Sequence, residues 1–270
     1  MTADGRVFDL PVVSASRWMF TCYGILGDDG TAALVDAGLP SSSLGALGAL
    51  RGVGRMPEDV ACVLATHGHS DHVGGFETVL QHTSAEALLP DRCRGYLEGE
   101  RPRNFGREAT VRFLPMWGQH PFDLTATREL ASAGRSIGFG QREQFTVPFE
   151  PAGFLGDGDP VPGAPGWTVI ATPGHTDDSI SLYHADSATL LSGDEVITHD
   201  GRAWFNPEWV DRDVHAATEE RLRALEVRHL LPGHGLPIEG DVWRNARSAG
   251  ECPPGGGLLT RCARRFGRWD

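Results

Sequence analysis

The chain contains no lysine, so all 24 of its basic Lys and Arg positions are arginine. A lysine nucleophile or a Schiff-base mechanism is therefore excluded. Acidic residues number 36, and the resulting net charge of −12 disfavours a surface that follows nucleic-acid phosphates. We therefore expect a small-molecule substrate and no nucleic-acid partner, and a homodimer is compatible with the sequence.

Cysteine and long apolar runs are also scarce. The five cysteines are an odd number without a CxxC spacing, which argues against a disulfide scaffold or a cysteine zinc site. The first residues, MTADGRVFDL, lack the pattern of a signal peptide. No apolar run approaches the roughly 18 residues that a membrane-spanning helix needs. We expect a cytoplasmic protein without a membrane segment.

Strand-like and helix-like segments alternate along the 270 residues, which predicts a layered α/β protein. The expected strands are 6–13, 17–26, 31–36, 60–65, 167–171, 179–183, 188–192 and 228–231. The expected helices are 44–51, a helix from 73 onward, 121–134 and 211–225. In the last of these, Val214, Thr218, Leu222 and Leu225 are expected to share the buried face.

Two segments interrupt this pattern. Residues 90–150 resemble an insertion that either covers or flanks a site or is a plain surface elaboration. Residues 250–270 form a C-terminal tail, expected to be a docked helix or a partly disordered end. We interpret 1–270 as one domain that carries both additions.

Four potential metal ligands lie within six residues: His67, His69, Asp71 and His72. They follow the predicted strand 60–65, at a strand-to-helix junction where side chains can converge. Clustered imidazoles and carboxylates suit zinc, iron, manganese or cobalt, and the lack of cysteine ligands argues against a closed structural zinc site.

Three later residues also follow predicted strands: His175, Asp194 and His234. Each alone is weak evidence, because Gly-Asp and Pro-Gly-His occur freely in turns. Together with the first cluster they place seven ligand-type side chains at strand ends on one edge, where layered α/β folds usually carry their active sites. His199, His215 and His229 are instead interpreted as surface or core histidines.

The motif HGHSDH (67–72) resembles the HxHxDH signature of the metallo-β-lactamase superfamily. The resemblance continues in order through TPGHT (172–176), SGD (192–194) and PGHG (232–235). It implies an αββα sandwich, in which two mixed β-sheets pack face to face with helices outside.

The resemblance also implies two divalent metal ions, most readily zinc, with manganese or iron as alternatives. The first ion would be bound by His67, His69 and His175, the second by Asp71, His72 and His234, and Asp194 would bridge both. Asp36 resembles a residue that fixes the geometry of the ligand loop, although a helix cap or turn residue is an equal interpretation.

Two metals about 3.5–4 Å apart would lower the pKa of a shared water toward neutrality and so supply a hydroxide for attack on a carbonyl carbon, which is our hypothesis for the mechanism. Asp71 and Asp194 are the expected catalytic carboxylates, and Asp71 is a candidate proton acceptor. Aromatic side chains near the site favour an acyl or aromatic substrate; Trp204 and Phe205 are candidates for its pocket, with ordinary packing as the alternative.

The bridging aspartate makes β-lactam cleavage less favoured, since the resemblance implies that true β-lactamases lack it. Glyoxalase II-like thioesterases and lactonases keep it, yet this chain has neither the lysine of the former nor a tyrosine shortly after Asp194. The leading hypothesis is a hydrolase of an ester, thioester or lactone. The alternatives are a one-iron persulfide dioxygenase-like oxidoreductase, a small endoribonuclease-like phosphodiesterase, and a non-catalytic binding protein.

Overall fold

Two mixed β-sheets pack face to face in the computed structural model, which describes residues 5–137 and 144–269. The first sheet has the order β1-β2-β3-β4-β5-β6, with β3 to β6 parallel and the β1–β2–β3 pairs antiparallel. Its strands are β1 Val12–Arg17, β2 Phe20–Leu26, β3 Ala32–Val35, β4 Val60–Leu64, β5 Glu86–Pro90 and β6 Gly153–Leu155.

The second sheet has the order β13-β12-β9-β8-β7, in which only β9 and β12 are parallel neighbours. Its strands are β7 Trp167–Ala171, β8 Ile180–His184, β9 Thr189–Gly193, β12 His229–Pro232 and β13 Ile238–Glu239. A separate hairpin joins β10 Val196–His199 to β11 Arg202–Phe205.

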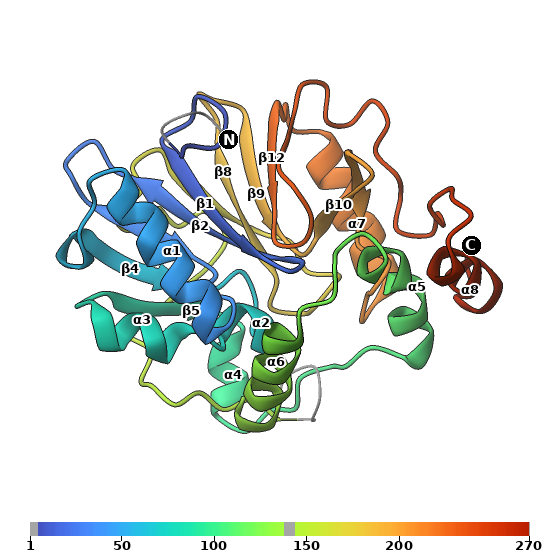
Figure 1. The fold of residues 1–270 in the computed structure, drawn as a ribbon, viewed down its shortest axis with the longest axis horizontal. Coiled ribbons are helices and arrows are strands. Elements are labelled where there is room, and N and C mark those ends of the chain that lie inside the picture. The colour runs from blue at the N-terminus through green and yellow to red at the C-terminus, as the bar shows by residue number, and fades with distance from the viewer. Residues whose placement is uncertain (1–4, 138–143, 270) are drawn as a thin grey trace.

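Helices cover both outer faces of this pair of sheets. Figure 1 shows α1 (Pro40–Gly52) and α3 (Phe76–His82) beside the first sheet and α7 (Arg212–Arg223) beside the second. The other helices are η1 Pro57–Asp59, α2 Ser70–Val73, α4 Cys93–Leu97, α5 Arg107–Trp117, α6 Leu124–Ser136 and α8 Leu258–Phe266. The αββα sandwich expected from the sequence is therefore confirmed.

The core has three parts that match these layers. The central part joins the inner faces of the two sheets, with Tyr23 and Leu64 on one side and Val169 and Leu191 on the other. A second part lies between the first sheet and its helices, and a third between the second sheet, α7 and the β10–β11 hairpin. Burial on both faces explains why β2, β3 and β9 consist entirely of buried residues.

Several expected boundaries were wrong. The segment 6–13 was expected to be a strand, but β1 begins only at Val12, because Pro11 lacks a backbone donor and Phe8 has a φ of 52°. The strand expected at 17–26 begins at Phe20, after a turn through Trp18 with a φ of 53°. On α7, Val214 is 39% exposed and does not join the buried face of Thr218 and Leu222.

Both additions contain helices among their described residues. Residues 90–150 contain α4, α5 and α6. The tail forms α8, which packs against α5, and Trp269 beyond it stacks on Trp204 with ring centroids 6.2 Å apart. Of the two interpretations of the tail, the docked helix is correct. Within residues 5–137 and 144–269, every helix is too short or too polar to cross a bilayer.

Candidate metal centre

The HGHSDH motif forms the loop and short helix that follow β4. His67 and His69 lie in the loop, and Asp71 and His72 lie on α2, which begins at Ser70. The backbone N–H of Gly68, between the first two histidines, donates to Asp178 Oδ2 at 2.7 Å. The three histidines are buried, with 0 to 7% of their surface exposed, so their imidazoles face the interior instead of solvent.

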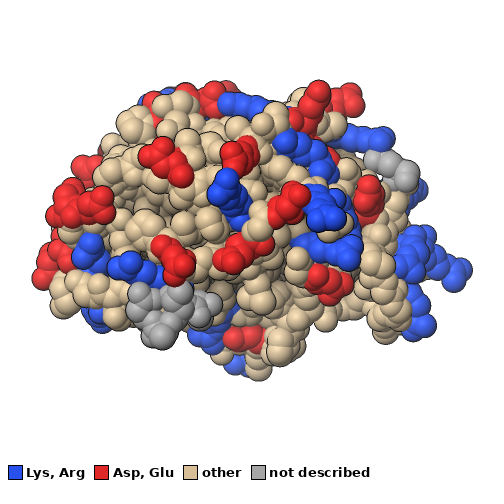
Figure 2. All heavy atoms as spheres, turned by 90° about the horizontal axis from the view of Figure 1, so that it is seen from above, with Lys and Arg blue, Asp and Glu red and all other residues tan. Residues whose placement is uncertain are grey.

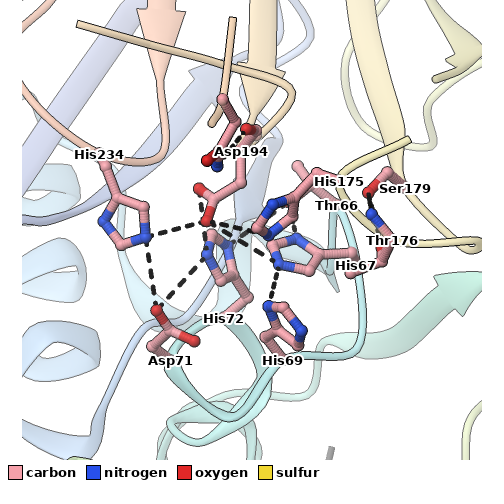
Figure 3. A network of polar contacts seen from close by, with 12 residues as sticks. Thr66, His67, His69, Asp71, His72, His175, Thr176, Ser179, Asp194 and His234 are labelled. Carbon is pink, nitrogen blue, oxygen red and sulfur yellow. Dashed lines mark hydrogen bonds and ion pairs between the residues drawn. The ribbon is translucent and has the colours of Figure 1, made fainter. Parts of the chain in front are cut away.

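The later ligand candidates come from the ends of neighbouring strands. Gly193 at the end of β9 pairs with Pro232 at the end of β12, so Asp194 and His234 emerge side by side. Figure 3 shows His234 and His175 pointing at the Asp194 carboxylate from two sides. Their Nε2 atoms lie 2.9 Å and 3.6 Å from Asp194 Oδ2.

All seven predicted ligands converge, in two groups. Within each group the ligand atoms lie no more than 4.8 Å apart. The groups are His67, His69 and His175, and Asp71, His72, Asp194 and His234. Asp194 belongs to the second group, but its Oδ2 also lies 4.0 Å from His67 Nε2, so its carboxylate stands between the two. This division matches the one that the family resemblance implied.

The donor set fits divalent cations. Imidazole and carboxylate together suit zinc, manganese and iron. Burial is the main reason that the pKa of His69 falls to about 4 and that of His175 to about 3, so both rings are neutral and able to bind a metal. Among the described side chains, His72 Nε2, His175 Nε2 and Asp194 Oδ1 are buried and make no hydrogen bond of good geometry, although His72 Nε2 and Asp194 Oδ1 lie 3.3 Å apart. Buried polar atoms of this kind are normally satisfied, and a cation would satisfy all three.

In two of the predicted histidine ligands, Nδ1, the ring nitrogen that faces away from the site, contacts an acceptor of the protein. His72 Nδ1 lies 2.9 Å from Asp36 Oδ2, and Asp36 also accepts from the backbone N–H of Thr66 at 2.8 Å. His175 Nδ1 lies 2.9 Å from the carbonyl oxygen of Glu208. A donating Nδ1–H leaves Nε2 free to bind a metal, so these contacts select the binding tautomer. Asp36 thus has the loop-fixing position that the resemblance implied.

A buried network behind the site was not identified from the sequence. Glu195 Oε2 accepts from the backbone N–H of His175 at 3.1 Å, and its Oε1 lies 2.6 Å from His215 Nδ1. Asn206 Nδ2 donates to the backbone carbonyl of Asp194 at 2.8 Å. The network therefore holds the backbone of two predicted ligands. Its one sequence signal was a second carboxylate directly after Asp194; His215 itself is a core histidine, as expected.

A cleft of about 350 Å³ opens onto the candidate metal ligands. Its walls include Phe105, Phe113 and Trp117 from the 90–150 segment, so this segment flanks the site and is more than a surface elaboration. Glu208 also lines the cleft, and burial raises its pKa to about 8. The site residues that border the cleft are His69, Asp71, His175, Asp194 and His234.

Trp204 and Phe205 do not line this cleft, so their interpretation as pocket residues was wrong. Both are fully buried on β11. Trp204 packs against the C-terminal Trp269, and Phe205 stacks on Trp243 with ring centroids 5.6 Å apart. The alternative of ordinary core packing is correct, and the aromatic walls come instead from the turn before β2 and from the 90–150 segment.

Comparison with known proteins agrees with this geometry. Residues 18–234 match the model of the metallo-beta-lactamase superfamily. The chain is similar to the probable metallo-hydrolase YflN of Bacillus subtilis (strain 168), with 27% identity over 233 residues and 78% of each chain covered. It is also similar to human metallo-beta-lactamase domain-containing protein 1, with 30% identity over 211 residues, 76% of this chain and 58% of the human one.

Solved structures share the fold. The BLEG-1 B3 metallo-beta-lactamase superposes with a TM-score of 0.58 at 20% identity, over 84% of this chain and 93% of the other. A metallo-beta-lactamase family protein from Thermus thermophilus gives 0.57 at 24% identity, over 86% and 75%. Because the family model covers most of the chain and the ligand motifs fall inside the match, this protein belongs to the metallo-beta-lactamase superfamily.

Proposed function

We propose that this chain is a hydrolase with two divalent metal ions that cleaves an ester, a thioester or a lactone. The observation that carries the proposal is the place of Asp194, whose carboxylate faces both ligand groups at the floor of the cleft. A single carboxylate between two groups of histidines is suited to bridge two cations. When bound, such a pair supplies an activated water and a Lewis acid for the carbonyl oxygen.

The side chains of the chain perform the remaining tasks. Zinc is the expected metal, with manganese or iron as alternatives that the same donors accept. Asp71 is the candidate proton acceptor: burial alone would raise its pKa, but His234 and His72 outweigh burial and lower the pKa to about 2. Its carboxylate is therefore ionised at neutral pH, and it borders the cleft where a substrate would lie.

The surface charge favours a small molecule over a nucleic acid. On the face in Figure 2, acidic and basic side chains alternate, and arginines gather at the end of the molecule where α8 lies. No continuous basic track crosses the residues coloured on that face. A phosphodiester polymer needs basic surface for affinity, and the net charge of −12 disfavours such a surface, so phosphodiester cleavage is the weaker proposal.

Metal content and turnover measured on the same samples test the proposal. Wild-type protein should bind two equivalents of zinc or manganese and hydrolyse members of a chromogenic ester, thioester and lactone panel. Asp194→Ala should lose both metal and turnover, because it removes the carboxylate that both groups face. Asp186→Ala is the matched control, since Asp186 is an exposed residue at the opposite end of β9.

Three outcomes would contradict the proposal in different ways. One equivalent of iron with oxygen uptake on a persulfide would identify an oxidoreductase. Turnover that survives complete removal of metal would exclude a metal-dependent hydrolase. Full metal loading without turnover on the ester, thioester, lactone and phosphodiester panel would indicate a binding protein on this scaffold.

A further inference from the structure

We propose that the substrate is electrically neutral and carries a compact apolar or aromatic group, which an aromatic wall built by Trp18, Phe113 and Trp117 recognises. The proposal rests on the function proposed above and narrows its substrate class. Its evidence is the charge of the cleft, the place of the aromatic rings beside the ligands, and the open aromatic surface at the mouth.

Apart from the predicted metal ligands His69, His175 and His234, the described lining of the cleft offers no basic side chain to an anionic substrate. Among its described lining residues there is no arginine, while Asp71, Asp194 and Glu208 contribute carboxyl groups. Two arginines on the adjoining segments are engaged elsewhere. Arg112 donates to the carbonyl oxygens of Pro207 and Gly267, at 2.6 Å and 3.2 Å, and Arg17 pairs with Asp123 at 3.1 Å.

A charged substituent on the substrate would therefore lose its hydration in the cleft without gaining a protein counter-charge. A carboxylate or phosphate substituent would need an arginine or lysine at this place as a counter-charge, and the described part of this cleft provides neither. Such a site selects against anions, because unfavourable contacts with an anionic substrate contribute to specificity as much as favourable contacts with a neutral one.

Aromatic rings stand beside both ligand groups. Phe105 lies 5.2 Å from His69 and 4.9 Å from His175, measured between ring centroids. On the other side, Phe113 lies 5.5 Å from His234. A carbonyl group placed at Asp194 would thus have apolar surface on each side of the bond that breaks. With a volume of about 350 Å³, the cleft is at the small end of ligand pockets, which favours a compact molecule.

At the mouth of the cleft, aromatic surface remains open. The Trp18 ring on the turn between β1 and β2 meets Trp117 edge-on at 5.8 Å and Phe122 at 6.1 Å. Trp117 is 45% exposed and Phe122 is 69% exposed. Exposed apolar side chains gathered at one place commonly mark a binding surface, and two of these rings, Trp18 and Trp117, line the same cleft as Asp71 and Asp194. The wall can cover an acyl chain or an aryl ring that extends outward from the metals.

A chain-length series tests this inference on the metal-loaded protein. We would measure kcat/KM for p-nitrophenyl acetate, butyrate and hexanoate, and for mono-p-nitrophenyl succinate, which resembles butyrate with a terminal carboxylate. Each added CH2 should raise kcat/KM about threefold to fourfold until the wall is covered. The succinate should react at least about tenfold more slowly than the butyrate, because its carboxylate is desolvated without a partner.

Variants assign the effect to the wall. Trp117→Ala should lower the ratio of hexanoate to acetate kcat/KM about tenfold, and Trp117→Phe should restore most of it. Leu44→Ala is the matched control, because Leu44 is also a large exposed residue (51%) but lies on α1, outside the lining of the cleft. Far-UV circular dichroism would show that each variant is folded.

Binding without turnover separates the two proposals. Tryptophan fluorescence would report the binding of N-methylhexanamide and of its ω-carboxylate counterpart, adipic acid monomethylamide, with the neutral amide expected to bind at least about tenfold more tightly. Hydrolysis with no dependence on chain length, or equal rates for succinate and butyrate, would overturn the neutral-substrate inference alone. Tight neutral binding without hydrolysis of any ester would support the wall and overturn the proposed function.

Discussion

Replacing Asp36 with asparagine should impair metal binding while the fold survives. The carboxylate of Asp36 faces His72 Nδ1 at 2.9 Å and also accepts from the backbone N–H of Thr66. Asparagine keeps one oxygen for Thr66 but places an NH2 group against His72. The imidazole then has to carry its proton on Nε2, the nitrogen that lies 3.3 Å from Asp194 Oδ1. A protonated Nε2 cannot bind a metal.

The expected loss follows from contacts of this kind at other metal sites. Removing the partner of a metal-binding histidine typically weakens metal affinity about 10- to 100-fold, or about 1.4 to 2.7 kcal/mol. The free energy of unfolding of the metal-free protein should fall by no more than about 2 kcal/mol, because the relocated proton meets Asp194 Oδ1. Asparagine also tolerates the φ of 54° at this position.

Competition with a chromophoric chelator would measure the affinity for zinc, and urea unfolding would measure stability. Asp200→Asn is a close control: Asp200 has a φ of 51° and faces His199 Nδ1 at 3.2 Å, but it lies outside the ligand groups. Wild-type zinc affinity in Asp36→Asn would refute the tautomer argument. An equal loss in Asp200→Asn would show that the effect is not specific to the site.

Three further predictions follow from the same geometry. Burial opposes a charge on His234, but the carboxylate of Asp194 outweighs burial and helps raise the pKa of His234 to about 10. Metal must therefore displace a proton, and metal affinity should rise between about pH 7 and 9; a flat profile in chelator competition would contradict this. Gly233→Ala should reduce metal content measured by mass spectrometry, because the new Cβ would collide with Asp194 Oδ1; full loading would show that the loop can yield. His215→Ala should cost about 3 kcal/mol in urea unfolding, since it leaves the buried Glu195 without its partner, and an unchanged midpoint would exclude that role.

The sequence predicted the candidate metal site best where the ligands are close together in the chain. Four of the seven lie within residues 67–72, and the register of a strand end followed by a helix brings them together locally. The ends of β9 and β12 could also be anticipated, because an apolar run precedes each and a glycine marks each end, Gly193 in β9 and Gly233 after β12. Apolar runs therefore predicted the strands and the edge that carries the site, while the layers were implied by the family resemblance.

The residues that line the cleft could not be predicted in the same way, because their positions depend on packing between distant parts of the chain. Trp204 follows Asp194 closely, and aromatic residues beside a catalytic motif are equally suited to a pocket wall and to a core. The choice depends on Trp269, which comes from the far end of the chain and stacks on the Trp204 ring. The wall residue Trp18 was not anticipated either, because its proximity to Trp117 exists only once β1, β2 and α5 are assembled.

The orientation of the ligands depends on acceptors that leave no mark in the sequence. His234 Nδ1 lies 3.2 Å from the backbone carbonyl of Met19, and His175 Nδ1 lies 2.9 Å from that of Glu208. Any residue supplies a carbonyl, so no side chain at these positions signals the contact. The first contact joins positions 215 residues apart, so the imidazole of His234 is oriented only when the turn before β2 packs against the end of β12. A metal should therefore bind the folded state and not the unfolded one. At a free metal concentration of about 100 times the dissociation constant, binding should stabilise the folded state by about 2.7 kcal/mol per independent site.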